Sequence, residues 1–253
     1  MKKPTSLTAL TSFLCFIGIL LLMALNSHSQ NVGRPQTPTI NFNNFPIASF
    51  DEPLPTESRA RADREVKNKK FNSNAKSISE SSTQIFTVMD WDVGLPAFPI
   101  ERSSAVVIGR VTEAKAYLSE DKTAIYSEFK VQIESVLKND DRCPIQPERA
   151  LIVGREGGRV RLPSGKIVVS WINHQNMPAV GGKYALFLTH ELPRGGDGGI
   201  DFYIVTAYEL ANGNVFPMDD IPSGHPIAAI KGRSESSFLN DLLSVLGSSP
   251  KSR

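Results

Sequence analysis

The sequence predicts a mainly β domain, built as an antiparallel sandwich or barrel, with a helix at its C-terminal end. Seven or eight short apolar segments follow Phe86 and are separated by turn residues, a pattern typical of such folds. The dipeptide Asn212-Gly213 is a strong hairpin signal, because both residues tolerate positive φ. A chain of 253 residues, 40% hydrophobic and 21% charged, suffices for one such domain with extensions.

Two long strands are expected at the start of the domain. The polar residues Ser119–Lys122 form the turn between them. Along the first strand the apolar face changes after Val111, and Gly109 is a candidate β-bulge that bends the strand. In the second strand, residues 125–137, alternation places the apolar side chains on one face: Ile125, Phe129, Val131, Ile133 and Leu137.

The later strands are shorter, and a helix follows them. Pro163-Ser164-Gly165 and Asn212-Gly213 are hairpin turns between strands that are predicted in residues 150–154, 159–162, 166–171, 183–189, 201–210 and 215–218. Ser234 is a helix N-cap and Gly247 a stop signal. Between them, one apolar stripe is expected to cover the core as a lid: Phe238, Leu239, Leu242, Leu243 and Leu246.

Residues 1–29 have the pattern of a signal peptide for export. Two lysines precede an apolar stretch at residues 7–25, and Ser29 and the serine two positions before it fit the small-residue rule for cleavage before Gln30. The alternative is an uncleaved anchor, because residues 7–25 are long enough to span a bilayer. The first interpretation predicts a secreted or periplasmic protein, and the second a single-pass membrane-anchored one with its domain outside the cytoplasm.

Residues 30–84 have the composition of a disordered linker, rich in Pro, Asn, Ser and alternating charge without apolar periodicity. Their basic stretch from Arg59 to Lys76 is expected to be a solvated tether. The alternative is an electrostatic contact with an anionic membrane or cell-wall polymer. The folded domain is then assigned to residues 85–247, and a disordered tail to residues 248–253.

Charge and cysteine content exclude several classes of function. The chain has 28 basic and 26 acidic residues, and removal of residues 1–29, which contain two lysines and no acid, leaves 26 of each. The remaining chain lacks the basic excess of a nucleic-acid-binding protein, so no nucleic-acid partner is expected. It also has a single cysteine, Cys143, which allows neither an intrachain disulfide nor a thiolate zinc cluster.

Several segments between residues 100 and 220 resemble a set of uncharacterised exported bacterial proteins. The similarity lies in GRV ending the first long strand, VLK ending the second, and GGKY before a buried strand: Gly109–Val111, Val136–Lys138 and Gly181–Tyr184. The layout is also similar to the netrin-like domain of tissue inhibitors of metalloproteinases. This resemblance implies a small antiparallel β-barrel of the oligonucleotide/oligosaccharide-binding type before the C-terminal helix. Those inhibitors need an N-terminal cysteine and several disulfides, which this chain lacks, so their inhibitory residues do not carry over.

No recognised catalytic or metal-binding motif occurs, so neither catalytic residues nor a cofactor or metal is expected. The serines at the PSG turns lack the strand-to-helix context of an exposed nucleophile. His174, His190 and His225 lack the spacing of paired ligands, and a lone loop histidine is usually solvated. Paired carboxylates are the basis of an alternative interpretation, an envelope hydrolase. The pairs are Asp90 with Asp92 and Asp219 with Asp220. Carboxylates beside Gly or Pro are, however, usually turn groups.

The PSG hairpin carries the candidate partner-binding surface. Its cations and a tryptophan could grip an anionic glycan or polymer: Arg155, Arg159, Arg161, Lys166 and Trp171. The alternative is that these are solvated strand charges that discourage edge pairing.

The function predicted from the sequence is an exported, non-catalytic binding or interaction module of the bacterial envelope. Its partner is an unknown envelope protein or an anionic glycan, and it contacts a membrane only through residues 7–25 if they stay uncleaved. The alternatives are the envelope hydrolase and a membrane-anchored structural protein.

Overall fold

The computed structural model describes residues 40–87, 94–191 and 201–248. All of them belong to one compact unit, Ile40–Arg253. In chain order the elements are η1 (Phe42–Asn44), β1 (Ile47–Ser49), α2 (Ser58–Lys70), β2 (Gln84–Thr87), β3 (Ala105–Leu118), β4 (Ile125–Lys138), β5 (Ala150–Glu156), β6 (Gly158–Arg161), β7 (Ile167–Ile172), β8 (Lys183–Glu191), β9 (Asp201–Ala211), β10 (Asn214–Pro217), η2 (Ala228–Ile230), β11 (Arg233–Ser234) and α3 (Glu235–Ser248).

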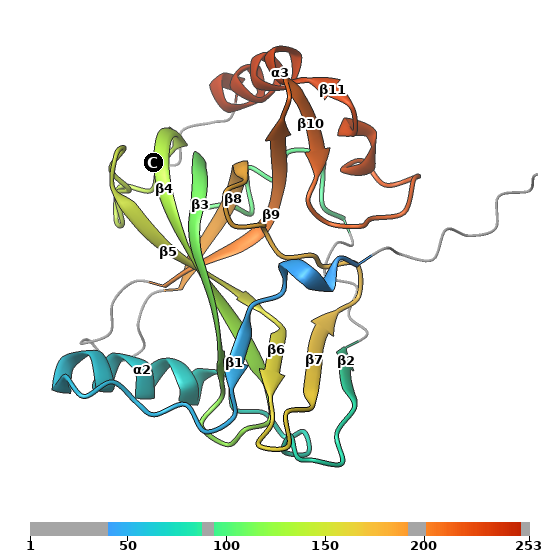
Figure 1. Ribbon diagram of the computed structural model, residues 1–253. Helices are drawn as coiled ribbons and strands as arrows, with labels where there is room; N and C mark the ends of the chain where they lie inside the picture. Colours follow the sequence, from blue (N-terminus) through green and yellow to red (C-terminus); the bar gives the residue numbers. More distant parts are fainter. Residues whose placement is uncertain (1–39, 88–93, 192–200, 249–253) are drawn as a thin grey trace, which may run out of the picture. The chain divides into compact units, whose positions relative to one another are not determined.

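A seven-stranded sheet forms the centre of this unit, in the order β11-β10-β9-β5-β4-β3-β8. Strand β9 also pairs with β8, so the pairings β3–β4–β5–β9–β8–β3 form a continuous five-strand circuit. Every pairing in this sheet is antiparallel except β5–β9, where Val153 lies opposite Phe202 and Gly154 opposite Tyr203. The prediction of a mainly β domain with an antiparallel sheet and a C-terminal helix is confirmed (Figure 1).

The long hairpin β3–β4 supplies the most extended pairing of the circuit. The predicted bulge is confirmed, because the β3–β4 register shifts between Ile108 and Gly109. A Cβ atom at Gly109 would lie 2.6 Å from a methyl carbon of Val131, so only glycine fits this close approach. The predicted Asn212-Gly213 hairpin is also confirmed, with φ of 52° and 74° at its two residues.

A second, four-stranded sheet has the order β1-β6-β7-β2. The chain leaves the first sheet at Gly157 and Gly158, whose φ values of 101° and 148° favour glycine. The predicted PSG hairpin is confirmed as β6–β7. Its edges are covered, because β1 pairs in parallel with β6 and β2 pairs in parallel with β7.

The prediction of a disordered linker over residues 30–84 is wrong for residues 40–84. Phe45, Ala48 and Ile78 are buried in the core of the domain, and α2 is helical. Hydrophobic periodicity could not reveal this segment, because its buried residues are isolated and its helix is almost entirely polar. The domain therefore includes the chain from Ile40 rather than from residue 85, whereas residues 1–39 and 249–253 lie outside the described residues.

Helix α3 covers a core cluster as predicted. Ser234 acts as its N-cap, since the Ser237 N–H donates to the Ser234 hydroxyl at 3.3 Å. Phe238 and Leu242 are buried in the cluster formed with β3, β8, β9 and β10, and the helix ends at Ser248. In the part of the chain that the structure describes, no helix has the length and apolar character needed to cross a membrane.

Candidate functional site

The structure contradicts the prediction that Arg155 lies on a binding surface. Arg155 is 2% exposed, and its Nη2 donates to Asp219 Oδ1 at 2.7 Å. The physical reason is the alternation of β5, since Arg155 shares a strand face with Val153, which is fully buried. A buried arginine of this kind is an internal ion-pair partner and cannot contact a macromolecule.

The other residues of the predicted surface do not converge either. Arg159 Nε donates to the carbonyl of Phe45 at 2.7 Å, and Lys166 Nζ donates to the carbonyl of Glu80 at 3.0 Å. Trp171 is half-buried and packs edge-on against Phe42, with ring centroids 5.3 Å apart. Arg161 is exposed and makes no ion pair with any residue that the structure describes. The hairpin cations Arg159 and Lys166 thus hold the N-terminal segment onto the domain.

The carboxylate Asp219 is also internal. It accepts hydrogen bonds from Arg155, from the Asn176 N–H at 2.9 Å and from the Thr206 hydroxyl at 3.0 Å. Burial raises the pKa of Asp219, whereas the guanidinium of Arg155 opposes that rise. Asp90 and Asp92 lie outside the described residues. Within 40–87, 94–191 and 201–248, no three His, Cys, Asp or Glu side chains are grouped so as to hold a metal ion.

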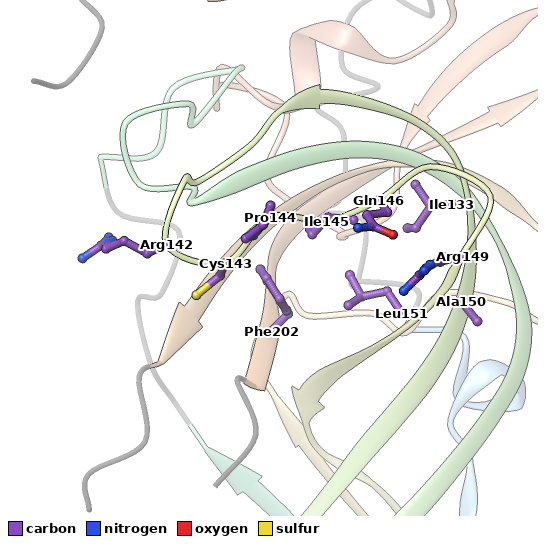
Figure 2. Close-up of a pocket in the computed structure, with 10 residues that line it drawn as sticks. All are labelled: Ile133, Arg142, Cys143, Pro144, Ile145, Gln146, Arg149, Ala150, Leu151 and Phe202. Carbon is purple, nitrogen blue, oxygen red and sulfur yellow. The ribbon is translucent and has the colours of Figure 1, made fainter. Parts of the chain in front are cut away.

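A pocket of about 300 Å³ lies beneath the loop 139–149, which connects β4 to β5 (Figure 2). Its floor is apolar and buried, and its rim is exposed and more polar. Floor residues come from the loop and from β4 and β9: Ile133, Cys143, Ile145 and Phe202. Rim residues come mainly from the loop: Arg142, Pro144, Gln146, Arg149 and Ala150. Half-buried Leu151 completes the lining.

The loop is held in a defined conformation over the pocket. The Asn139 side-chain amide bridges it, accepting from the Ile145 N–H and donating to the Ile145 carbonyl, both at 2.9 Å. Farther along, the Glu148 N–H donates to the Ile133 carbonyl at 2.8 Å, and the Ile133 N–H donates to the Arg149 carbonyl at 3.0 Å. These hydrogen bonds hold the loop in place, so the pocket is preformed in the folded domain.

The two guanidinium groups at the rim differ in their environment. Arg142 is paired with Asp140 through two hydrogen bonds, at 2.8 and 3.1 Å, and its side chain extends away from the other lining residues (Figure 2). These bonds hold the pKa of Asp140 well below its usual range. Arg149 is exposed and forms no ion pair with another described residue. The pocket therefore combines an apolar floor with the guanidinium of Arg149, for which the described residues supply no ion-pair partner.

Sequence reasoning treated Cys143 only as a single cysteine without a disulfide or zinc role and did not select Arg149. Both belong to a loop whose apolar residues face back toward β4, which no periodicity reveals. His190, expected to be a solvated loop residue, is instead in β8. Its side chain is buried against Phe202, with Nδ1 3.8 Å from Asp140 Oδ2. The available sequence signal was the continuous apolar run of residues 184–188, which leads directly to His190.

Comparisons with protein-family models, with curated proteins and with solved structures found no match. The ligand that the pocket binds is therefore inferred from the residues of this chain.

Proposed function

We propose that the protein is an exported, non-catalytic binding module of the bacterial envelope, and that the pocket beneath loop 139–149 is its ligand site. The observation that carries this proposal is the combination of a buried apolar floor with the exposed guanidinium of Arg149, which pairs with no acidic side chain among the described residues. Such a pocket favours a small ligand that has both an apolar group and an anionic group. The Arg149 guanidinium would form a charge-assisted hydrogen bond with a carboxylate of the ligand.

The dimensions and lining of the pocket favour this ligand over the partners expected from the sequence. At about 300 Å³ it is at the lower end of small-molecule sites. A stable protein partner needs about 800 Å² of surface on each side. A bare anionic glycan needs several polar partners for its hydroxyl groups. The pocket offers few, such as Gln146 and Arg149, and its floor is apolar. An amphipathic anion fits better than a glycan or an envelope protein.

We also propose that the five-strand circuit is a β-barrel of the oligonucleotide/oligosaccharide-binding type, as the netrin-like resemblance implies. The order β8-β3-β4-β5 supports this proposal, because in chain order it is 4-1-2-3, the arrangement of a Greek key. The fifth strand, β9, pairs with both ends of that row. A five-stranded Greek-key barrel is the architecture of this fold type.

Of the alternative functions, the hydrolase has less support among the described residues. Its candidate Asp219 is engaged by Arg155, Asn176 and Thr206 and is buried away from a substrate. Its neighbour Asp220 is half-buried, and the Asp220 carbonyl oxygen lies 2.8 Å from His174 Nδ1. A membrane-anchored structural role depends on residues 7–25, which lie outside the described residues. Cleavage before Gln30 distinguishes that role from the proposed one.

The first expected result concerns export. Mass spectrometry of the secreted or periplasmic protein should find Gln30 as its first residue, because the serines preceding it fit the signal-peptidase rule. Recovery of the intact N-terminus, Met1, in the membrane fraction would instead establish the anchored form.

The second expected result concerns the pocket, with octanoate as probe and octanol as its uncharged counterpart. By calorimetry, the full chain should bind octanoate at least about tenfold more tightly than octanol, because a charge-assisted hydrogen bond contributes about 1.5–3 kcal/mol. Arg149→Ser should abolish that difference. Ala150→Trp, which places an indole at the exposed rim, should weaken binding of both probes.

The matched control is Arg161→Ser, which removes an exposed arginine that does not line the pocket. This variant should bind both probes like the parent. Equal losses in Arg149→Ser and Arg161→Ser would show non-specific charge attraction. Failure of the parent to bind octanoate, together with Arg149-dependent binding of polygalacturonate, would replace the proposed ligand with an anionic glycan.

A further inference from the structure

Helix α2 contacts the domain through a polar stripe. Arg64, Lys67, Asn68 and Phe71 follow the i, i+3, i+4, i+7 spacing that aligns side chains on one side of a helix. In most surface helices this stripe is apolar and buried. In α2 no residue is buried, and the aligned helical positions are occupied by two cations and an amide. The helix is therefore held mainly by charge and hydrogen bonds.

Acidic side chains from β4, β8 and β9 form ion pairs with the cations of α2. The ion pairs are Arg64–Glu128 at 2.8 Å, Lys67–Glu128 at 3.1 Å, Lys67–Asp201 at 3.0 Å and Lys70–Glu191 at 2.7 Å. Glu128 is central to this arrangement, because two cations bind its side chain, which is only 12% exposed. Charge-assisted hydrogen bonds of this geometry recognise a basic segment specifically.

Tyrosine rings surround these carboxylates. Tyr126 accepts a hydrogen bond from Arg64 Nη1 at 2.8 Å and donates one to Asn68 Oδ1 at 2.7 Å. The rings also make the following contacts: Tyr117 with the Arg64 guanidinium at 3.5 Å, Tyr203 with the Lys70 ammonium at 4.1 Å and Tyr126 with the Phe71 ring at 4.2 Å. We call this surface the acidic–aromatic face: Tyr117, Tyr126, Glu128, Asp201 and Tyr203.

Few other contacts hold α2: the exposed Lys69–Glu120 pair at 3.9 Å, and the Glu120 N–H, which donates to the Asn68 carbonyl at 3.2 Å. Glu57 at its N-terminus makes no side-chain capping bond, and an isolated helix of 13 residues is marginal in water. The chain is fixed on both sides of it, by β1 before the helix and by the Ser73 N–H, which donates to the Thr123 hydroxyl at 3.0 Å, after it. The helix is thus a tethered segment whose attachment between these points is largely electrostatic.

We propose that the acidic–aromatic face is a recognition site for a lysine- and arginine-rich helical segment of a partner protein, and that α2 occupies this site within the chain. Charge complementarity carries the inference: the face presents carboxylates and aromatic rings at positions that match Arg or Lys at i and i+3 and an aromatic residue at i+7. Tethering gives α2 a high effective concentration, so a partner segment binds only when it displaces the helix.

The test uses the full chain and a labelled synthetic peptide that copies residues 57–72. In the release variant, Arg64→Ser, Lys67→Ser and Lys70→Ser remove the ion pairs of α2 with Glu128, Asp201 and Glu191 and leave the face intact. This variant should bind the peptide at least tenfold more tightly than the parent, because the internal competitor is lost. Binding should weaken between 0.05 and 0.5 M salt, since these contacts are screened.

Three controls define the specificity. A matched variant, Arg59→Ser with Arg61→Ser and Lys69→Ser, loses the same charge from exposed positions of α2 and should bind like the parent. A peptide with serine at positions 64, 67 and 70 should not bind. Adding Glu128→Gln and Asp201→Asn to the release variant should abolish binding. The proposal is overturned if the release variant binds no better than the parent, or if binding survives the carboxylate substitutions.

A measurement on the parent does not depend on the folding of any variant. Saturating peptide should accelerate amide hydrogen exchange in residues 58–70, because displaced α2 loses its helical hydrogen bonds. Unchanged exchange at saturation would also overturn the proposal. So would a parent protein that binds anionic phospholipid vesicles while the release variant binds neither vesicles nor the peptide, since the cations of α2 rather than the face would then be the binding element.

Discussion

Asp219→Ala is expected to lower the free energy of unfolding by about 3–5 kcal/mol, the usual cost of removing one partner of a buried ion pair. The Arg155–Asp219 pair is 2.7 Å long, and its side chains are 1% and 0% exposed. The substitution leaves the Arg155 guanidinium buried without this carboxylate. It also removes the acceptor of the Asn176 N–H and of the Thr206 hydroxyl. Urea unfolding monitored by circular dichroism measures the loss.

The control for this prediction is an exposed ion pair. Arg61 and Glu65 pair on α2 with side chains 56% and 47% exposed, so Arg61→Ala should change stability by less than about 0.5 kcal/mol. The double variant Arg155→Met/Asp219→Leu should recover part of the loss, because it removes both buried charges. A loss below about 1 kcal/mol for Asp219→Ala would contradict the assignment of this pair to the interior.

Phe238→Ala is expected to have an effect of similar size, about 3–5 kcal/mol, because it opens a cavity beneath α3. The Phe238 side chain is 0% exposed, and its ring lies 5.1 Å from that of Tyr208 and 5.4 Å from that of Phe98. Thermal and urea unfolding should both show the loss in a single cooperative transition if α3 belongs to the core.

Leu243 provides the comparison on the same helix. It belongs to the predicted apolar stripe but is 51% exposed, so Leu243→Ala should cost less than about 1 kcal/mol. Equal losses in Phe238→Ala and Leu243→Ala would contradict the packing of α3. A separate first transition in Phe238→Ala would mean that the helix unfolds independently of the sheet.

The sequence alone predicted strands β3 to β10, their hairpins, the bulge and the final helix, but not β1, β2 or β11. These features depend on residues that are close along the chain. Gly109 marks the bulge, Asn212-Gly213 adopts the positive φ values that the turn requires, and Ser234 caps α3. Local steric and hydrogen-bonding rules act over a few residues, so their signals are visible in the sequence itself.

The candidate site was less predictable. The pocket exists because loop 139–149 folds back over β4, and the sequence of that loop indicates only turns. Arg149 therefore had no feature that distinguished it from other surface arginines. The predicted cationic surface was selected by proximity along the hairpin, whereas the structure uses Arg159 and Lys166 to hold the chain near Phe45 and Glu80.

Only the tertiary structure determined which charges are buried and what they bind. Arg155 meets Asp219 and Arg64 meets Glu128, each across a sequence separation of 64 residues. Neither pairing follows a strand or helix period, because each depends on where distant segments pack. The sequence thus determined local structure and the exposed or buried face of most strands, while the roles of its charged residues were decided by long-range contacts, whose energy depends on burial and on the position of the opposite charge.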